Sequence, residues 1–523
     1  MPVLTSALDT STEAYQHSRA AALAALATLA EQLALARAGG GPRHAGRHRR
    51  RGALLVRERI ELLLDRDTPF LELSALAAWG TEFNVGASVV TGIGVVCGVE
   101  CVLIAPDPAV RGGVMNPFTL KKKLRALEIA RRNQLPVITL VECGGADRSG
   151  AAEPSGQAGR ILRDLTELSA LGTPTIALAF GSSAGGGYVP GMCDYSVLVE
   201  REAGAFQAGP PPGQPAGGPD SGDEELGGAA MRSRVRGLSD YLAADERNAI
   251  WLGRQIVAGL SWRKHGPGRP ADEPVHDPQE LLGIASADFR VPFDPREVLA
   301  RVVDGSRFSE YRPLYGTSLV TGWASIHGFG AGVLANARSV LFRAEAEKAA
   351  EFISLANQSG TPLIFLQNTT GYMAGKSYEH GGMIKDGAKM LSAVANSTVA
   401  HITMNIGASF GTGSYGMAGR SCDPRLMFSW VNARLAVLGA EQLAGVLSIV
   451  SRRAAQAAGR QYDPAAGQRR RREIEEQIER ETQAFYVTAR LYDDGVIDPR
   501  DTRTVLGLAL SAACSAPVGG RSG

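Results

Sequence analysis

The sequence contains one long internal duplication, and this repeat constrains the fold more than any other feature. In each half a Thr-Gly pair, Thr91-Gly92 and Thr321-Gly322, opens two alternating strands. A charged helix, a buried strand, a second buried strand with a Gly-rich turn, and a Cys-Asp pair follow in the same order. The matching segments include the helices 120–133 and 344–358, the strands 136–142 and 362–367, and the pairs Cys193-Asp194 and Cys422-Asp423. A unit of roughly 150 residues is too long for a solenoid repeat and predicts two tandem α/β domains of one fold.

Two further features set the expected domain boundaries. Residues 262–290 are charged and rich in Pro and Gly, so we expect a linker there and divide the chain into domains 1–290 and 291–523. Residues 12–37 have Leu and Ala at helical spacing and end at three glycines, and residues 54–64 have the pattern of a short amphipathic helix. We therefore expect a helical extension over residues 1–60.

Composition excludes several classes of function. The 523 residues carry a formal net charge of +2, so the overall charge does not indicate nucleic acid or a membrane as a partner. We see no signal-peptide pattern and expect no membrane-spanning segment. Six cysteines are too few for a disulfide framework, which favours a reduced, cytoplasmic location. The basic cluster 43–51 stays open between a nucleic-acid signal and a solvated linker or subunit contact.

The candidate functional segments are the two Gly-rich turns, 181–191 and 407–420. Each follows a buried strand and leads toward a helix start, where backbone N–H groups bind negative charge. Two familiar motifs nearly fit the second half. Residues 411–416 have the glycine spacing of a dinucleotide fingerprint without its downstream acid, and residues 371–377 resemble a P-loop that is one residue short. We attribute both matches to chance.

Both turns also satisfy the Gly-x-Ser-x-Gly pattern of a nucleophile elbow, centred on Ser183 and Ser409. A serine hydrolase needs a histidine downstream; none follows Ser409, and none after Ser183 stands in a distinctive context. The eight histidines show no metal-binding spacing, so we expect no metal. Two sets of backbone donors without a side-chain nucleophile suit a reaction in which donor and acceptor both become enolate-like. Hydrolysis by Ser183 remains an alternative.

Several stretches carry a family resemblance over nearly the whole chain. They are VTGIGVVCGVECVLIAPDP (90–108), CGGAD (143–147), SAGGGYVPGM (183–192), the segment 365–390, YGMAGR (415–420) and DDGVIDPRDTR (493–503). Together they resemble the carboxyltransferase (β) subunits of biotin-dependent acyl-CoA carboxylases. The run Asn368-Thr-Thr-Gly-Tyr-Met resembles the methylcrotonyl-CoA and geranyl-CoA branch.

The resemblance implies two tandem crotonase-like (ClpP/crotonase) domains with duplicated β-β-α units and a homohexamer whose active site joins the N-half of one subunit to the C-half of another. It implies that carboxybiotin releases CO2, that biotin then removes a proton from the acyl-CoA, and that the thioester enolate attacks CO2. This chain has no biotinylation pattern and no convincing ATP-binding loop. We therefore expect a partner subunit with biotin carboxylase and the biotin carboxyl carrier, and noncovalent binding of biotin and acyl-CoA without a metal.

By motif position the resemblance implies the following site residues. The catalytic backbone amides are those of Gly185, Gly186, Thr412 and Gly413. The acyl-CoA side includes Gly144, Gly145, Ala184 and Gly187. The biotin side includes Phe410, Gly411, Gly371 and Tyr372.

Two loops depart from the family pattern, and both lie on the acyl-CoA side. Residues 209–223 are rich in Pro and Gly and lack the usual lysine, and residues 147–160 lack the usual apolar side chains. A second interpretation follows from these departures: a catalytically weakened paralogue that acts as a structural subunit of an acyl-CoA carboxylase complex.

Overall fold

The first half of the chain forms strands and helices in an alternating order. The computed structural model describes residues 1–145, 153–184, 188–200, 205–206, 238–262, 264, 266–286, 288, 290–459 and 463–516. The strands are β1 Leu71–Leu73, β2 Val89–Val96, β3 Val99–Pro106, β4 Val137–Cys143, β5 Thr175–Ala184, β6 Tyr195–Val199, β7 Ala205–Phe206 and β8 Tyr241–Ala243. The helices are α1 Glu13–Ala38, α2 Gly41–Arg50, α3 Val56–Leu63, α4 Pro117–Asn133, α5 Glu153–Ala170, α6 Tyr188–Met192 and α9 Glu246–Gly259.

The second half repeats this order after a short connecting region. The connection contains α10 Leu281–Ile284 and α11 Pro295–Leu299. The strands are β9 Ser309–Glu310, β10 Leu319–Ile326, β11 Phe329–Asn336, β12 Val340–Leu341, β13 Leu363–Thr369, β14 Gly371–Tyr372, β15 His401–Phe410, β16 Leu426–Trp430, β17 Arg434–Ala436 and β18 Val496–Ile497. The helices are α12 Arg343–Ser359, α13 Lys376–His380, α14 Met383–Ala395, α15 Gly411–Gly416, α16 Ala440–Ala457, α17 Pro464–Glu481, α18 Ala484–Ala489 and α19 Thr502–Ala513.

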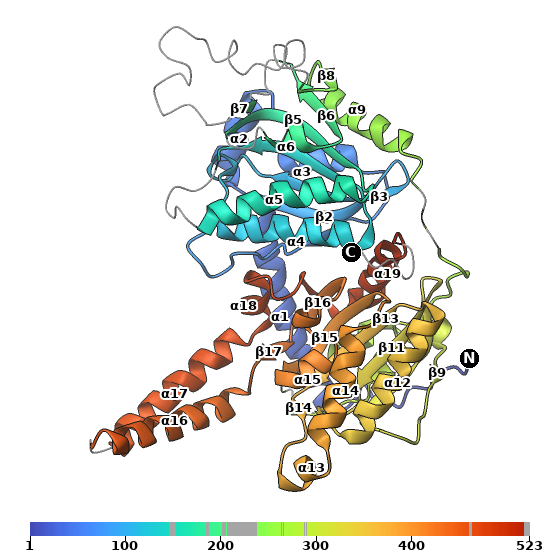
Figure 1. The fold of residues 1–523 in the computed structure, drawn as a ribbon, viewed down its shortest axis with the longest axis vertical. Coiled ribbons are helices and arrows are strands. Elements are labelled where there is room, and N and C mark those ends of the chain that lie inside the picture. Colours follow the sequence, from blue (N-terminus) through green and yellow to red (C-terminus); the bar gives the residue numbers. More distant parts are fainter. Residues whose placement is uncertain are drawn as a thin grey trace.

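Each half builds one eight-stranded mixed sheet, and the two sheets form separate bodies (Figure 1). The first sheet has the order β1-β2-β3-β4-β5-β6-β8, with β7 paired to β5. The second has the order β18-β16-β15-β13-β11-β10-β9, with β17 paired to β15. In both, an antiparallel hairpin is followed by parallel strands connected through helices. The predicted α/β fold with a duplicated β-β-α unit is confirmed.

The duplication extends to the side chains that close equivalent turns. Asp65 accepts hydrogen bonds from both backbone N–H groups of the 97–98 turn, at 2.9 and 2.7 Å. Asp304 accepts the same two bonds from the 327–328 turn, at 2.9 and 2.8 Å. In each turn the first residue has a φ of 49° and is followed by a glycine. A carboxylate that holds two adjacent N–H groups fixes this left-handed turn in both halves.

A buried lysine anchors the first long helix of each half to the sheet. Lys122 of α4 donates to the carbonyl of Val89 at 2.7 Å, and Lys348 of α12 donates to the carbonyl of Leu319 at 2.8 Å. These ammonium groups satisfy carbonyls at the start of β2 and β10, where the antiparallel hairpins begin. Burial lowers the pKa of Lys122 to about 8.

An ion cluster joins the two bodies. Arg125 of α4 donates to Asp494 at 2.8 Å, and Arg420 donates to the same carboxylate at 3.1 Å. Asp494 is 0% exposed. Burial by itself would raise the pKa of Asp494, but the guanidinium groups of Arg125 and Arg420 outweigh it and lower the pKa to about 2. Because Arg125 belongs to the first half and Asp494 to the second, the pair fixes one half against the other.

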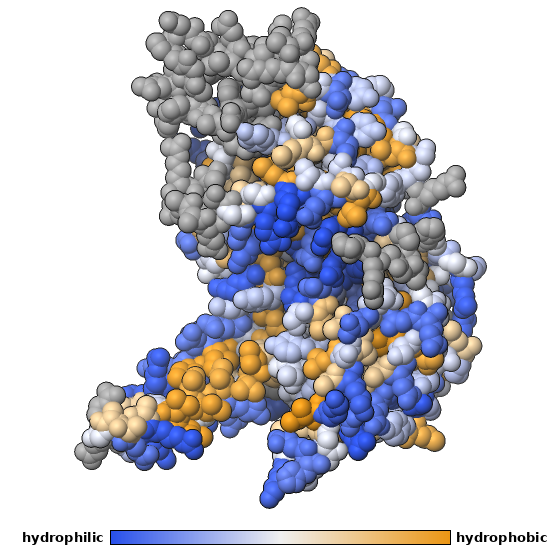
Figure 2. Space-filling model, viewed as in Figure 1, coloured by the Kyte–Doolittle hydropathy of each residue, from blue (hydrophilic) through white to orange (hydrophobic). Residues whose placement is uncertain are grey.

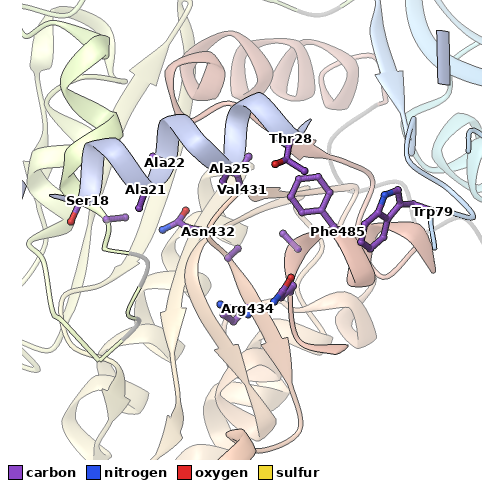
Figure 3. Close-up of a pocket in the computed structure, with 14 residues that line it drawn as sticks. Ser18, Ala21, Ala22, Ala25, Thr28, Trp79, Val431, Asn432, Arg434 and Phe485 are labelled. Atoms are coloured by element: carbon purple, nitrogen blue, oxygen red, sulfur yellow. The ribbon is translucent and has the colours of Figure 1, made fainter. Parts of the chain in front are cut away.

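The N-terminal segment packs on the second body. Val3 forms a β-bridge with Arg307, and a side chain at Gly283 would come within 2.3 Å of the Tyr15 ring of α1. Figure 3 shows Ala22 and Ala25 of α1 facing Val431 across a cavity of about 330 Å³. The helix α3, by contrast, packs in the core of the first body. The extension 1–60 therefore contacts both bodies.

The extension contains one helical stretch that reaches membrane-spanning length. In the part of the chain that the structure describes, residues 13–50 are long and apolar enough to cross a membrane by length and hydropathy, although only 11% of the apolar window is buried. The apolar character comes from the Ala and Leu residues of α1, which ends at Gly39 with a φ of 53°. Core helices of proteins that do not enter a membrane pass the same test, and Tyr15 and Leu29 of α1 pack against protein.

A helical hairpin made of α16 and α17 projects from the second body (Figure 1). Its first helix carries four exposed apolar side chains: Val446, Leu447, Ile449 and Val450, which are 48%, 40%, 56% and 56% exposed. Figure 2 shows an apolar patch along this hairpin. Large aliphatic side chains that gather on a projecting element indicate a protein contact surface.

Candidate active site

The Gly-rich turn of the second half joins β15 to α15. Phe410, the last residue of β15, precedes α15 and provides no side-chain cap. Gly411 has a φ of 53°, and a side chain at Gly413 would lie 2.7 Å from the Cα of Gly371. Both positions therefore require glycine. The first N–H groups of a helix, here including those of Thr412 and Gly413, have no intrahelical acceptor and can bind an anionic oxygen.

Two buried side chains, those of Gln367 and Ser409, support this short helix. Gln367 of β13 donates from Nε2 to the carbonyl of Met417 at 2.5 Å and to that of Ser414 at 3.2 Å. Its Oε1 accepts a hydrogen bond from Ser409 at 2.5 Å, and Ser409 Oγ lies 2.8 Å from Ser414 Oγ. Ser409 is 0% exposed, so it has no access to a substrate as a nucleophile. The sequence pattern does not reveal the role of Gln367.

Tyr372 fills the space behind α15. A side chain at Gly416 would come 2.2 Å from the Tyr372 hydroxyl, and one at Gly387 of α14 would contact the ring at 3.6 Å. Within the described residues this hydroxyl is buried without a hydrogen-bond partner, and its burial raises the pKa of Tyr372. Tyr372 and Gly371 therefore pack against the helix.

A cavity of about 1370 Å³ opens beside this turn. Phe410, Thr370 and Ser339 line its inner end, and Gly439 lies at the start of the projecting hairpin. The outer wall contains Arg434, Gln468, Arg471, Arg472, Glu475 and Glu479. Arg434 pairs with Glu479 at 3.1 Å and Arg471 with Glu475 at 2.8 Å, so this wall is polar and internally paired.

The first half has the same backbone arrangement at the end of β5. Ser183 and Ala184 pair with residues 205–206 of β7, as Ser409 and Phe410 pair with residues 435–436 at β17. The predicted residues Gly185, Gly186 and Gly187 lie outside the described residues. The helix α6 begins directly after them, at Tyr188. The described residues thus repeat the order of strand and helix found in the second half.

In both halves the strand pairing shifts in register shortly before the Gly-rich segment. The residue inside the shift is the acidic Glu142 in the first half and the neutral Asn368 in the second. The pairing register shifts between Val141 and Cys143 in the first sheet and between Gln367 and Thr369 in the second. The residue inside each shift crowds a glycine of the neighbouring strand: Glu142 lies 2.7 Å from a side-chain position at Gly181, and Asn368 lies 2.4 Å from one at Gly407.

Glu142 and Asn368 have different partners. Asn368 Oδ1 accepts a hydrogen bond from the N–H of Ala408 at 3.0 Å. Glu142 accepts one from Arg59 at 2.6 Å, and Arg59, which is 1% exposed, also binds Glu246 at 2.7 Å. The residue inside the first register shift therefore belongs to an ion network, and the one inside the second bonds through a neutral amide. Aligning the two repeats by the glycines would have singled out these two positions.

The predicted acyl-CoA residues Gly144 and Gly145 follow β4. The N–H of Gly144 donates to the carbonyl of Gly112 at 2.9 Å, and the carbonyl of Gly145 accepts from Met115 at 2.9 Å. Gly145 has a φ of 96°. The pair thus closes against the 107–113 turn. Ala184, the third residue predicted for this side, is the last residue of β5.

Among the described residues, no group of three or more His, Cys, Asp or Glu side chains is arranged to hold a metal ion. All six cysteines are free thiols.

Comparison with known proteins identifies related chains. Residues 47–520 match the family model of the carboxyl transferase domain. The chain is 57% identical to a probable biotin-dependent acyl-coenzyme A carboxylase β2 subunit of Mycobacterium tuberculosis over 99% of both chains. It is 44% identical to the methylcrotonoyl-CoA carboxylase β chain of Dictyostelium discoideum, over 99% of this chain and 89% of that one. The structure matches the β subunit of geranyl-CoA carboxylase of P. aeruginosa with a TM-score of 0.89 and 39% identity, over 100% of this chain and 99% of that chain.

Proposed function

This chain belongs to the carboxyl transferase family of biotin-dependent acyl-CoA carboxylase β subunits, and on that premise we propose its substrate class and the roles of its residues. The subunit transfers CO2 to an acyl-CoA. The single observation that carries the assignment is the match of the whole chain, including both Gly-rich turns, to β subunits of this family.

The proposed substrate is a branched or unsaturated acyl-CoA of the methylcrotonyl or geranyl kind. Identities of 44% to a methylcrotonoyl-CoA carboxylase β chain and 39% to a geranyl-CoA carboxylase β subunit support this class. The run from Asn368 to Met373 supports it too, because it resembles the same branch.

The residues around α15 fit biotin. The cavity beside Phe410 is about 1370 Å³, and the glycine at 413 lets the helix start pack directly against Gly371 and Thr369. Biotin, when bound, supplies the carboxyl group and a ureido oxygen that becomes electron-rich as that group leaves. The N–H groups of Thr412 and Gly413 would hold this oxygen, and those of Gly185 and Gly186 would hold the thioester oxygen of the acyl-CoA. Each preorganised backbone donor of this kind lowers the activation barrier by about 3–4 kcal/mol.

We place the complete site between two subunits. In one chain α6 lies in the upper body and α15 in the lower body (Figure 1). We therefore propose that each of these helices meets its counterpart from a second subunit. The apolar patch of α16 supports self-association, and a homohexamer is the proposed assembly. A biotin carboxylase and biotin carboxyl carrier subunit is the proposed partner, and the six free thiols suit a cytoplasmic location.

Incorporation of labelled bicarbonate tests this function. The chain, copurified with its biotinylated partner, is given ATP and a panel of 3-methylcrotonyl, geranyl, propionyl, acetyl and long-chain CoA thioesters. We expect label in a branched or unsaturated thioester. Label only in propionyl-CoA or acetyl-CoA would contradict the substrate class.

A stable complex that labels no thioester would favour the second candidate, a structural paralogue. The observation behind that candidate is the unusual composition of the loops 147–160 and 209–223. A Ser183→Ala variant separates the carboxyltransferase from a hydrolase, because a carboxyltransferase keeps its activity and a hydrolase loses it.

A further inference from the structure

The short helix α2 carries an uncompensated positive charge. Its sequence, GPRHAGRHRR, has no acidic residue, and Arg51 follows directly. Arg43, Arg47 and Arg51 are exposed and follow one another at a spacing of four residues, which places them on one face of the helix. Like charges at this spacing destabilise a helix by about 0.2–0.5 kcal/mol per pair, so the face is not explained by helix stability.

Most of this charge has no partner in the protein. Arg49 pairs with Glu58 at 2.5 Å. In the described part of the chain, Arg43, Arg47 and Arg51 form no ion pair. The cations in the last turn interact favourably with the helix dipole, but that effect does not require a face of arginines that extends back to residue 43.

The protein holds α2 firmly in place at both ends. At its start, a side chain at Gly40 would come within 1.8 Å of the carbonyl oxygen of Ala109. At its end, the His48 ring nitrogen Nε2 lies 3.1 Å from the carbonyl oxygen of Leu54. The helix is therefore fixed across the 107–113 turn and is not a mobile basic tail.

The same 107–113 turn forms one wall of the acyl-CoA side. The carbonyl of Gly112 accepts the N–H of Gly144 at 2.9 Å, and that of Gly113 accepts a hydrogen bond from the Cys143 thiol at 3.2 Å. Arg111 lies in this turn with a φ of 48°, is exposed and makes no ion pair within the described residues. One side of the turn thus contacts Gly144, and the other contacts the start of α2.

From this arrangement we propose that the arginine face of α2, with Arg111, binds the phosphate groups of the CoA thioester. The inference rests on the proposed function, which places the thioester near Gly144 and Gly145. The pyrophosphate and the 3′-phosphate are the only strongly anionic groups of an acyl-CoA, and they lie at the far end of its pantetheine arm. Guanidinium groups bind phosphate through paired, charge-assisted hydrogen bonds.

The test compares three thioesters of the same acyl group: the CoA, 3′-dephospho-CoA and pantetheine forms. The variant is Arg43→Gln/Arg47→Gln/Arg51→Gln, assayed in the complex with the biotinylated partner. Arg66→Gln is the matched control, because Arg66 is exposed in the same half but follows Asp65, at the opposite end of β3 from the 107–113 turn. If the triple variant does not fold, Arg47→Gln alone replaces it.

We expect the triple variant to raise KM for the CoA thioester at least about tenfold with kcat unchanged. KM for the pantetheine thioester should stay the same, and the Arg66→Gln enzyme should match the wild type with all three substrates. If the triple variant raises KM less for the 3′-dephospho-CoA thioester than for the CoA thioester, the arginine face binds the 3′-phosphate. If KM rises equally for both thioesters, the face binds the pyrophosphate. A rise in KM that is equal for the CoA and pantetheine forms, or no rise at all, would overturn the proposal.

Direct binding keeps this inference separate from the proposed function. Calorimetric titration of the full chain with free CoA should show weaker binding by the triple variant even if no thioester is carboxylated. In that case the proposed function fails and the phosphate site stands. Unchanged CoA affinity together with lost affinity for a DNA oligonucleotide would assign the helix to nucleic acid. Unchanged CoA affinity with altered sedimentation would assign it to a subunit contact.

Discussion

The hydroxyl of Ser409 donates a hydrogen bond to Oε1 of Gln367 at 2.5 Å, and both side chains are 0% exposed. Through Nε2 the same Gln367 holds two carbonyls of the segment that forms α15 and its end. The position of the backbone donors in α15 therefore depends on a side chain that lies one strand away and does not itself face the cavity.

Replacing Gln367 should reduce catalysis without weakening acyl-CoA binding. Gln367→Leu removes the Gln367 hydrogen bonds to the carbonyls of Ser414 and Met417 and to the Ser409 hydroxyl, at a cost of about 1–3 kcal/mol in the free energy of unfolding. We expect kcat to fall about tenfold and KM for the acyl-CoA to stay constant, because the first half is untouched. Ser409→Ala should keep kcat within a few-fold. Steady-state kinetics and denaturant unfolding check both variants, and a raised KM with normal kcat would contradict this role.

The glycine at position 413 should be irreplaceable. In Gly413→Ala the new methyl group meets the Cα of Gly371 and Oγ1 of Thr369, both at 2.7 Å, so α15 must move. Loss of one aligned donor costs about 10²–10³ in rate, and we expect that fall in kcat for carboxylation. Gly445→Ala in α16 is the control, because a side chain there meets no atom within 4 Å. Near-normal carboxylation by Gly413→Ala would exclude this turn from the chemistry.

The buried carboxyl of Asp493 should make stability depend on pH. Burial raises its pKa from 3.8 to about 6, against the hydrogen bond from Ser429. The folded state therefore binds a proton more readily than the unfolded state, and this group's contribution to stability falls as pH rises from 4 to 6. Asp493→Asn removes the charge, so we expect a gain of about 1–3 kcal/mol in the free energy of unfolding at pH 8 and none below pH 4.

A second buried group, His401, changes the free energy of unfolding of the wild type with pH in the opposite direction to Asp493. Burial lowers the pKa of His401 from 6.5 to about 4, so the folded state resists protonation and stability is lost as pH falls through that range. The measurement that isolates Asp493 is therefore the difference between wild-type and Asp493→Asn unfolding curves at each pH. A difference that is the same at pH 4 and pH 8 would show that the charge is not responsible.

The apolar face of α16 should hold subunits together. Ile449 and Val450 are each 56% exposed, and in Ile449→Asp/Val450→Asp two charges replace them. Desolvating those charges would oppose association, so we expect smaller species than the wild type in sedimentation velocity experiments, with a lower carboxylation rate. Ser451→Asp on the same helix is the control for added charge. An unchanged assembly would place the subunit interface elsewhere.

Local patterns predicted those elements whose ends depend on nearby residues. The helix expected over 12–37 is found at Glu13–Ala38, with Thr12 as its N-cap and Gly39 at its end. The strand expected over 136–142 is found at Val137–Cys143. The basic cluster, left open between a nucleic-acid signal and a linker or subunit contact, forms most of the helix α2, which begins with Gly41-Pro42 and has cations in its last turn. Pro at a helix start and cations at its end are both favourable, and that signal was present in the sequence.

Contacts between distant segments could not be predicted in this way. Arg59 is a polar residue on an amphipathic helix, and nothing near it in sequence indicates that it is 1% exposed between Glu142 and Glu246. The pairing of Arg125 with Asp494 depends equally on tertiary packing. The family resemblance supplied the backbone donors, but the support of α15 by Gln367 emerged only from the coordinates.

The attachment of the first residues to the second body has a consequence for biosynthesis. The carbonyl of Pro2 accepts a hydrogen bond from the N–H of Phe308 at 3.0 Å, and the N–H of Leu4 donates to the carbonyl of Ser306 at 2.8 Å. At a translation rate of about 5–20 residues per second, these partners emerge roughly 15–60 s after the segment that binds them. During that interval the nascent chain presents the apolar side of α1 without its docking site. The first residues therefore cannot take their final place until the segment 306–308 has left the ribosome.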